Sequence, residues 1–181
     1  YCSKEIFMNN YYTGVGSRDT PADRCNLMTK IARFLNTLRY TLRSGGADGA
    51  DLAFEAGAGV LKEIYLPWKN FNGSNSDLYN SPPEAEEIAK KFHPVWHKLK
   101  HGARALHTRN VHQVLGKDLK TPTEFVVCWT SDGKASGGTG QAMRIATHYC
   151  IPIYNLYNNE DEIALKLLLH GIRENRLGKE S

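Results

Sequence analysis

Three glycine-rich segments contain the residues with the most potential for chemistry. They are Gly14-Val-Gly-Ser-Arg18, Ser44-Gly-Gly-Ala47 and Gly137-Gly-Thr-Gly140. Each follows an apolar run typical of a buried strand and precedes a helical pattern, which aims backbone N–H groups and a helix N-terminus at an anion. A tight turn also needs glycine, so one such loop alone does not decide. In a doubly wound parallel sheet all three loops open at the carboxyl edge, and their convergence predicts a phosphate-binding crevice.

Charged and aromatic side chains beside these loops are candidates for direct ligand contact. Arg18 and Arg109 offer fork-shaped positive charge for a phosphate, and a surface ion pair is the alternative for Arg18. Asp48 and Asp51 are candidate acceptors for a ribose hydroxyl or a base, or else a helix cap and a surface charge. Trp129 ends a predicted strand and either stacks on a base or belongs to the core. The predicted ligand-binding set is Gly14, Gly16, Ser17, Arg18, Ser44, Gly45, Gly46, Ala47, Asp48, Asp51, Arg109, Asn110, Trp129, Gly137, Gly138, Thr139, Gly140 and Gln141.

The elements that must position these residues alternate along the chain. Apolar runs predict strands leading into the first loop and at 40–43, 62–66, 125–129 and 151–156. Helical patterns are expected after Thr20-Pro21, from Gly49 and at 83–92, 94–115, 141–149 and 160–172. This alternation implies parallel pairing through right-handed crossovers. We therefore expect an α/β fold with a doubly wound, mainly parallel sheet of about five or more strands and helices on both faces.

Length and composition fit one ordinary globular domain. The chain has 181 residues, 41% hydrophobic and 23% charged, with a formal net charge of +4. We divide it into a tether at 1–10, a single domain at 11–172 and a polar tail at 173–181. No apolar run approaches the roughly 20 residues of a membrane helix, and the start shows no signal-peptide pattern, so no membrane partner is expected. Four cysteines without a C-x-x-C pair favour free thiols and a reducing, cytoplasmic location.

Two further segments are unusual. Segment 67–83 is long for a loop of a compact domain and contains Trp68, Phe71 and Tyr79, so we expect a folded lid over the site or an interface flap. The helical region after it contains five histidines, at 93, 97, 101, 107 and 112. Histidines four apart share a helix face, but no carboxylate or cysteine is interleaved at ligand spacing. We therefore expect surface or packing histidines and no metal site.

Four motifs, in this order, resemble those of the SLOG superfamily of Rossmann-like domains. They are Gly14-Val-Gly-Ser-Arg18, Ser44-Gly-Gly-Ala-Asp-Gly-Ala-Asp51, Leu106-His-Thr-Arg-Asn110 and Gly137-Gly-Thr-Gly140. The similarity covers roughly 11–168, and the second motif is most similar to the DprA-like and YspA-like branches of bacteria and phages. The resemblance implies binding of a nucleotide or nucleotide-derived ligand, such as ADP-ribose or a nucleoside monophosphate, with no required cofactor. It also implies homodimers or higher homo-oligomers and, for a phage-encoded protein, the host cytoplasm.

The LOG branch of this superfamily cleaves the N-glycosidic bond of nucleoside monophosphates with an arginine and a Pro-Gly-Gly-x-Gly-Thr-x-x-Glu motif. Arg109 matches the arginine, whereas Ser136, Gln141 and Arg144 stand at the positions of the proline, the threonine and the glutamate. A carboxylate can stabilise an oxocarbenium-like centre or activate water, whereas an arginine favours an anion. Either the ligand is bound without hydrolysis, or another carboxylate serves, for which the candidates are Asp48, Asp51 and Asp132.

Three functions are consistent with these features. The leading expectation is nucleotide binding by a sensor or sequestering protein. The first alternative is a nucleotide phosphoribohydrolase, with Arg109, Asp48 and Asp51 as candidate catalytic residues. The second alternative is DprA-like binding of single-stranded DNA. Its candidate surface is a basic patch at Lys90, Lys91, Lys98, Lys100 and Arg104. On a helical segment such a cluster is more often a solvated face.

Overall fold

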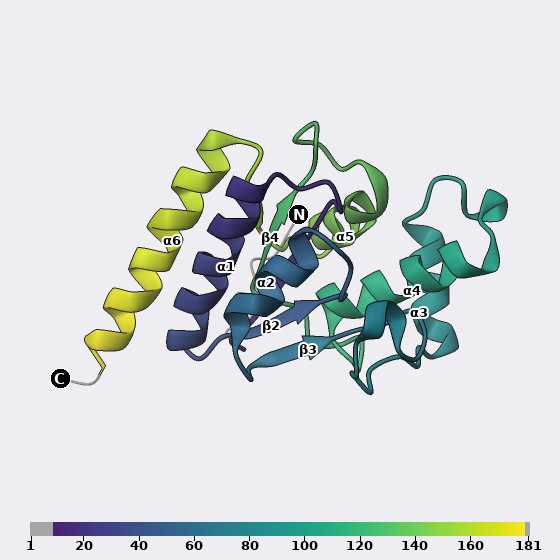
Figure 1. Ribbon diagram of the computed structural model, residues 1–181, viewed down its shortest axis with the longest axis horizontal. Coiled ribbons are helices and arrows are strands. Elements are labelled where there is room, and N and C mark those ends of the chain that lie inside the picture. Colours follow the sequence, from purple (N-terminus) through teal and green to yellow (C-terminus); the bar gives the residue numbers. More distant parts are fainter. Residues whose placement is uncertain (1–8, 180–181) are drawn as a thin grey trace.

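One five-stranded sheet lies between two layers of helices in the computed structural model, which describes residues 9–179 (Figure 1). The strands are β1 (Tyr11–Gly16), β2 (Thr41–Ser44), β3 (Lys62–Ile64), β4 (Phe125–Trp129) and β5 (Ile153–Asn155). The α-helices are α1 (Ala22–Thr37), α2 (Ala50–Ala58), α3 (Pro83–Lys91), α4 (His101–Leu115), α5 (Gly137–His148) and α6 (Asn159–Leu177). All strands pair in parallel, in the order β3-β2-β1-β4-β5. The predicted doubly wound α/β fold of Rossmann-like type is confirmed.

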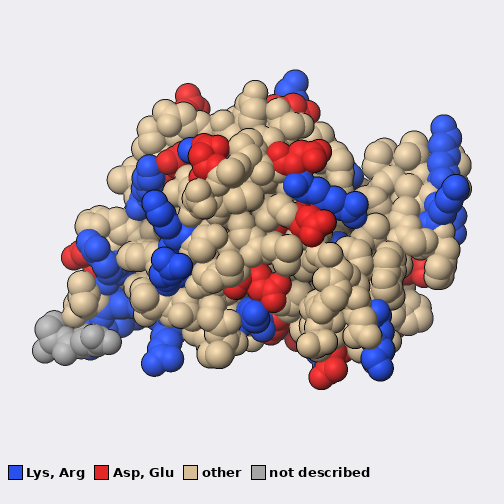
Figure 2. Space-filling view, viewed as in Figure 1, with Lys and Arg blue, Asp and Glu red and all other residues tan. Residues whose placement is uncertain are grey.

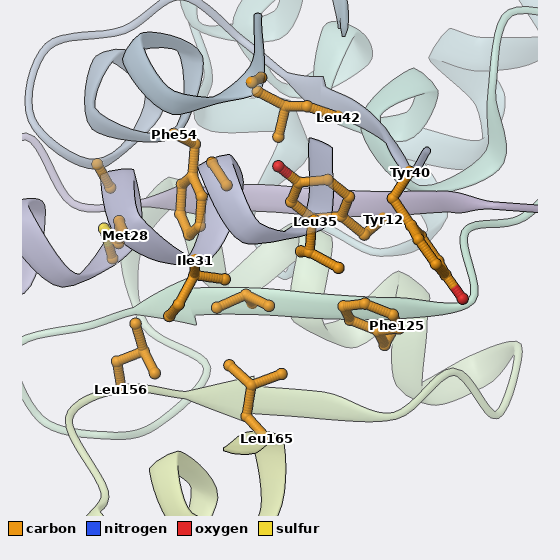
Figure 3. Close-up of a cluster of buried hydrophobic side chains, with 14 of the residues drawn as sticks. Tyr12, Met28, Ile31, Leu35, Tyr40, Leu42, Phe54, Phe125, Leu156 and Leu165 are labelled. Atoms are coloured by element: carbon orange, nitrogen blue, oxygen red, sulfur yellow. The ribbon is translucent and has the colours of Figure 1, made fainter. Parts of the chain in front are cut away.

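Each face of the sheet has its own apolar core. Helices α1, α2 and α6 cover one face, where their side chains meet Phe125, Val127 and Trp129 of β4 in the first core. Figure 3 shows Phe125 together with labelled side chains of these helices. Helices α4 and α5 cover the other face, where Val126 and Cys128 of the same strand point into the second core. This alternation follows from the two-residue period of a strand. A strand buried on both faces must be apolar throughout, which explains the continuous run at 125–129.

Three predicted helix boundaries differ from the structure. Helix α5 begins at Gly137 rather than at 141, so the glycine motif forms its first turn. The region 94–115 is interrupted, because Trp96 turns inward in a short 3-10 turn and packs in the second core before α4 begins. The predicted start of the polar tail at residue 173 is wrong, since α6 continues to Leu177. Arg176 anchors this last turn by donating to Asn10 Oδ1 at 2.9 Å and lying over the Tyr40 ring.

The predicted tether lies mostly outside the described residues, as do residues 180–181 of the predicted tail. The last two residues of the tether, however, form hydrogen bonds to the domain. Asn9 Nδ2 donates to the carbonyl of Pro122 at 2.7 Å, and the Asn10 amide donates to Glu124 Oε1 at 2.8 Å. These bonds fix the entry of the chain into β1.

The cysteines differ from one another in state. Cys25 and Cys128 are free thiols, and burial raises the pKa of Cys128 to about 12. The expectation of a free thiol is wrong for Cys150, which is disulfide-bonded. Cys150 lies exposed after α5 instead of in the core, so its sulfur is accessible for bonding. In residues 9–179, no helix combines the length and the apolar character needed to cross a membrane.

The strand order reverses between β1 and β4, and this reversal creates the site. The chain leaves β1 and reaches β2 on one side, whereas it reaches β5 from β4 on the other. Gly16 and Trp129, the last residues of β1 and β4, are paired in register. The loops that leave them lead to α1 and α5, on opposite faces of the sheet. In open α/β sheets, the crevice between two such diverging loops is the usual place for a ligand.

Candidate functional site

A cleft of about 480 Å³ opens at the carboxyl ends of β1 and β4. It is formed by the loop after β1, the start of α2, the middle of α4, and the loop and first turn of α5. The predicted ligand-binding residues that line it are Gly16, Ser17, Arg18, Ala47, Asp51, Arg109, Asn110, Gly137, Gly138 and Thr139. The lining residues that were not predicted are Val15, Asp19, Leu106, His107, Gln113, Thr130, Ser131, Ser136 and Ala142.

The other predicted residues lie outside the cleft lining: Gly14, Ser44, Gly45, Gly46, Asp48, Trp129, Gly140 and Gln141. Gly14 is packed against the first core, where a β-carbon would lie 2.6 Å from the Phe54 ring. Ser44 Oγ donates to the Gly14 carbonyl at 2.6 Å. Trp129 is only 8% exposed and belongs to the same core. The first two glycine-rich segments thus serve close packing of strands and helices as well as the cleft.

The first turn of α5 presents an uncapped helix N-terminus to the cleft. Gly137 has φ +61°, and a β-carbon on it or on Gly138 would meet no atom within 4 Å. Ser136 stands at the N-cap position without capping the helix, because its Oγ donates to Asp132 Oδ1 at 2.8 Å. The first backbone amides of α5 therefore have no side-chain partner among residues 9–179. They carry the partial positive charge of a helix N-terminus.

Arg109 places a buried positive charge in the wall of the cleft. Its Nη1 donates to the carbonyls of Gly45 and Tyr65, and its Nε donates to Asn110 Oδ1 at 3.1 Å. The guanidinium also lies 5.6 Å from the centre of the Phe71 ring. Burial lowers the pKa of Arg109 to about 10, so the side chain stays charged at neutral pH. The arginine both supports the second glycine loop and adds positive potential to the site.

Asp51 supplies a buried carboxyl group to the same wall. It is 4% exposed, so the alternative of a surface charge is wrong. Its Oδ2 accepts from the amide of Ala47 at 3.3 Å. Burial raises the pKa of Asp51 to about 6, against the opposing influence of Arg109 and nearby backbone amides. A carboxyl group that titrates near neutrality can serve as acid, base or hydrogen-bond acceptor. Asp48, in contrast, is exposed and caps no helix; it accepts from Asn72 Nδ2 at 2.9 Å.

His107 lines the cleft and belongs to a polar network, although the sequence predicted a surface or packing role. Its Nδ1 lies 2.8 Å from Gln141 Oε1, which Asn110 Nδ2 also approaches at 3.2 Å. Gln141 Nε2 in turn bonds to the Ala89 carbonyl at 2.9 Å. One sequence signal was available: positions 107, 110 and 113 are three apart, which places His107, Asn110 and Gln113 on one face of a helix.

Arg144, at the position of the LOG glutamate, does not face the cleft. Its Nε donates to the Phe92 carbonyl at 2.9 Å, and its Nη1 donates to the Ala135 carbonyl at 3.2 Å. It therefore ties α5 to the end of α3 and to the loop that precedes α5. Asp132, the exposed third candidate carboxylate, is likewise absent from the cleft lining. Of the candidate carboxylates, only Asp51 lines the cleft.

Segment 67–83 folds against the back of the second glycine loop. Asn72 Nδ2 donates to the carbonyl of Gly46 at 3.0 Å. Phe71 packs on the first core and beneath Arg109. The Trp68 ring stands edge-on to the Phe71 ring, with ring centres 5.3 Å apart. No residue of this segment lines the cleft. It therefore supports the wall of the site and is not a lid in this structure.

A second charged feature lies on the connection from α3 to α4. From 88 to 117 the sequence contains no Asp or Glu. The four lysines of the predicted patch are exposed and form no ion pair with any residue that the structure describes. Figure 2 shows Lys and Arg side chains along the right edge, where this connection lies. Arg104 is half-buried and lies 5.7 Å from the centre of the Trp96 ring.

Within residues 9–179, no group of three or more His, Cys, Asp and Glu side chains is placed to hold a metal ion. No family model, no curated protein and no solved structure matches the chain. The function must therefore be inferred from the fold and from the cleft.

Proposed function

We propose that the protein binds a nucleotide or a nucleotide-derived ligand in the cleft, as a sensor or sequestering protein. The observation that supports this most is the convergence of an uncapped helix N-terminus with Arg18 and Arg109 at the reversal point of a parallel sheet. Backbone N–H groups and guanidinium groups are the usual partners of a phosphate. The order of the SLOG-like motifs supports the same class of ligand.

The size and lining of the cleft fit a ligand of this kind. Pockets for small molecules generally measure about 300–1,000 Å³, and the cleft measures about 480 Å³. Its hydroxyl and amide groups can bond to a sugar, and they come from Ser17, Asn110, Gln113, Thr130, Ser131 and Thr139.

Calorimetric titration with nucleoside mono- and diphosphates, ADP-ribose and cyclic nucleotides tests the proposal. Binding of at least one of them is expected, and Arg18→Gln should weaken it. Arg33→Gln is the matched control, because Arg33 is an exposed arginine of α1 away from the cleft. If no phosphate-bearing nucleotide binds, the proposal is rejected.

A second candidate function, hydrolysis of the N-glycosidic bond of a nucleoside monophosphate, is favoured by Asp51. A buried carboxyl group with a raised pKa is suited to protonate a leaving base or to activate water. The reaction would consume one water molecule and yield the free base and ribose 5-phosphate. Chromatography of nucleoside monophosphates after long incubation should then show base release that Asp51→Asn abolishes. Intact nucleotide in the presence of measurable binding would leave binding alone as the function.

A further inference from the structure

The hydrogen-bond network around His107 has a direction that can be derived atom by atom. A backbone carbonyl only accepts, so the group of Gln141 that lies 2.9 Å from the Ala89 carbonyl is its NH₂ group. The side-chain oxygen of Gln141 therefore points to His107. An amide oxygen only accepts as well. The Nδ1 atom of His107, 2.8 Å from this oxygen, must consequently carry a hydrogen and donate it.

Asn110 supports the same assignment from the other side. The Nε–H of Arg109 can only donate, so the Asn110 atom that it contacts at 3.1 Å is the amide oxygen. The NH₂ group of Asn110 then faces two acceptors, the Gly138 carbonyl at 3.3 Å and Gln141 Oε1 at 3.2 Å. Both amides are thus oriented by groups with a single possible role. In the neutral form, His107 carries its proton on Nδ1 and a free lone pair on Nε2.

The Nε2 atom is available to a ligand. Within residues 9–179 it has no hydrogen-bond partner, yet it is not among the buried polar atoms that lack one. It is therefore reachable by solvent, and its ring lines the cleft. Burial lowers the pKa of His107, and the nearby His93, Arg144 and Arg109 act in the same direction, whereas the bond to Gln141 opposes them. At neutral pH the ring is uncharged, and Nε2 is an acceptor.

The remaining lining favours the sugar as the part of a nucleotide that meets this acceptor. Among residues 9–179, no Phe, Tyr or Trp lines the cleft, so a base would find none of these large rings to stack on and only the smaller imidazole ring of His107. A dianionic phosphate has no hydrogen to donate and would be repelled by a lone pair. Sugar hydroxyls, in contrast, donate readily. The cleft lining offers them His107 Nε2 and, elsewhere in the same lining, the carboxyl group of Asp51.

We propose that His107 is a specificity-determining residue, whose Nε2 accepts a hydrogen bond from a sugar hydroxyl of the phosphate-bearing ligand. The proposal rests on the proposed function and refines it. The cleft recognises the phosphate and the sugar, and the base contributes little to selection.

Two variants of His107 separate the atoms involved. In His107→Asn the side-chain amide can still donate near the Nδ1 position but reaches no further. In His107→Gln an amide oxygen can take the place of Nε2. The probes are AMP, 2′-deoxy-AMP and 3′-deoxy-AMP, measured by calorimetry. For the wild-type protein, the loss of the hydroxyl that bonds to His107 should weaken binding about tenfold, because an acceptor that the bound ligand covers is left unpaired.

The proposal predicts that this penalty disappears in His107→Asn, which should bind AMP about as weakly as the wild type binds the deoxy analogue, and returns in part in His107→Gln. His101→Asn, on the exposed first turn of α4, is the control and should behave like the wild type. ¹⁵N NMR of the imidazole should show the proton on Nδ1. If AMP binds but both deoxy penalties are the same in wild type and His107→Asn, or if the proton is on Nε2, this inference is overturned while the proposed function stands. If the wild-type protein binds no nucleotide, both fail.

Discussion

Gly138→Asp should stabilise the fold and, at the same time, weaken the proposed anion binding about 100-fold. Gly138 is the second residue of α5, and a β-carbon there would meet no atom within 4 Å. Aspartate in a first helical turn faces the positive end of the helix dipole. It also has fewer backbone conformations than glycine in the unfolded chain, so less conformational entropy is lost on folding. The new carboxylate would, however, stand in the lining of the cleft, where the phosphate is proposed to bind.

The two effects have different magnitudes. Lower backbone freedom and the favourable dipole together contribute about 0.5–1.5 kcal/mol to the free energy of unfolding. For a chain of this size this raises the melting temperature by about 2–5 °C. Two unit charges about 5 Å apart repel by about 3 kcal/mol at an effective dielectric constant of 20. Such a repulsion corresponds to about 100-fold weaker binding of a phosphate.

Thermal unfolding and calorimetry with AMP measure both quantities on the same sample. Gly138→Ala is the matched control, because it restricts the backbone without adding charge and should retain AMP affinity within a few-fold. Unchanged AMP affinity in Gly138→Asp would refute the assignment of the α5 N-terminus as the anion site. A lower melting temperature of Gly138→Asp would contradict the helical conformation and the open space at Gly138 in the first turn of α5.

Three other perturbations test separate parts of the structure. Asp51→Asn should flatten the pH dependence of stability. The pKa of Asp51 is raised from 3.8 to about 6, so the native wild-type protein holds this proton more tightly than the unfolded chain does. Its free energy of unfolding should therefore fall by up to about 3 kcal/mol as the pH rises from 4 to 6, and urea unfolding at several pH values would show whether the variant lacks this fall. Gly16→Ala should lower the free energy of unfolding by about 1–3 kcal/mol, since its β-carbon would lie 2.6 Å from that of Ala50; an unchanged urea midpoint would contradict the close packing of α2 on β1. If the basic patch binds single-stranded DNA, joint replacement of Lys98 and Lys100 by Glu should abolish the gel shift of a labelled oligonucleotide at low salt, whereas no shift with the wild-type protein would dismiss that function.

The sequence predicted the sheet well because buried strands and glycine turns leave local signals. The range 125–129 coincides with β4 because this central strand is buried on both faces and must be apolar throughout. The start of α5 was placed four residues late, because glycine normally disfavours a helix. At a helix N-terminus that rule is weaker, since the first amides need no intrahelical partner, and Gly137 can adopt φ +61° without strain.

The roles of single side chains in the cleft were less predictable, because they depend on partners far away in the sequence. Arg144 stands in the glycine motif, yet two of its nitrogens bond to backbone carbonyls, one of which lies 52 residues away. Its position in the motif therefore says little about its contact with a ligand. His107, in contrast, was not predicted as a site residue and yet lines the cleft. Its role could not be derived from the sequence, because an isolated histidine can carry its proton on either nitrogen.

His107 offers an acceptor to the cleft only because Gln141 accepts from Nδ1, and Gln141 is oriented for this by the Ala89 carbonyl, again 52 residues away. A local motif can therefore predict a candidate anion-binding position, since backbone amides at a helix start are a property of the segment itself. The group proposed to select the rest of the ligand depends on tertiary contacts, and it becomes visible only when each donor in the network has been matched to its acceptor.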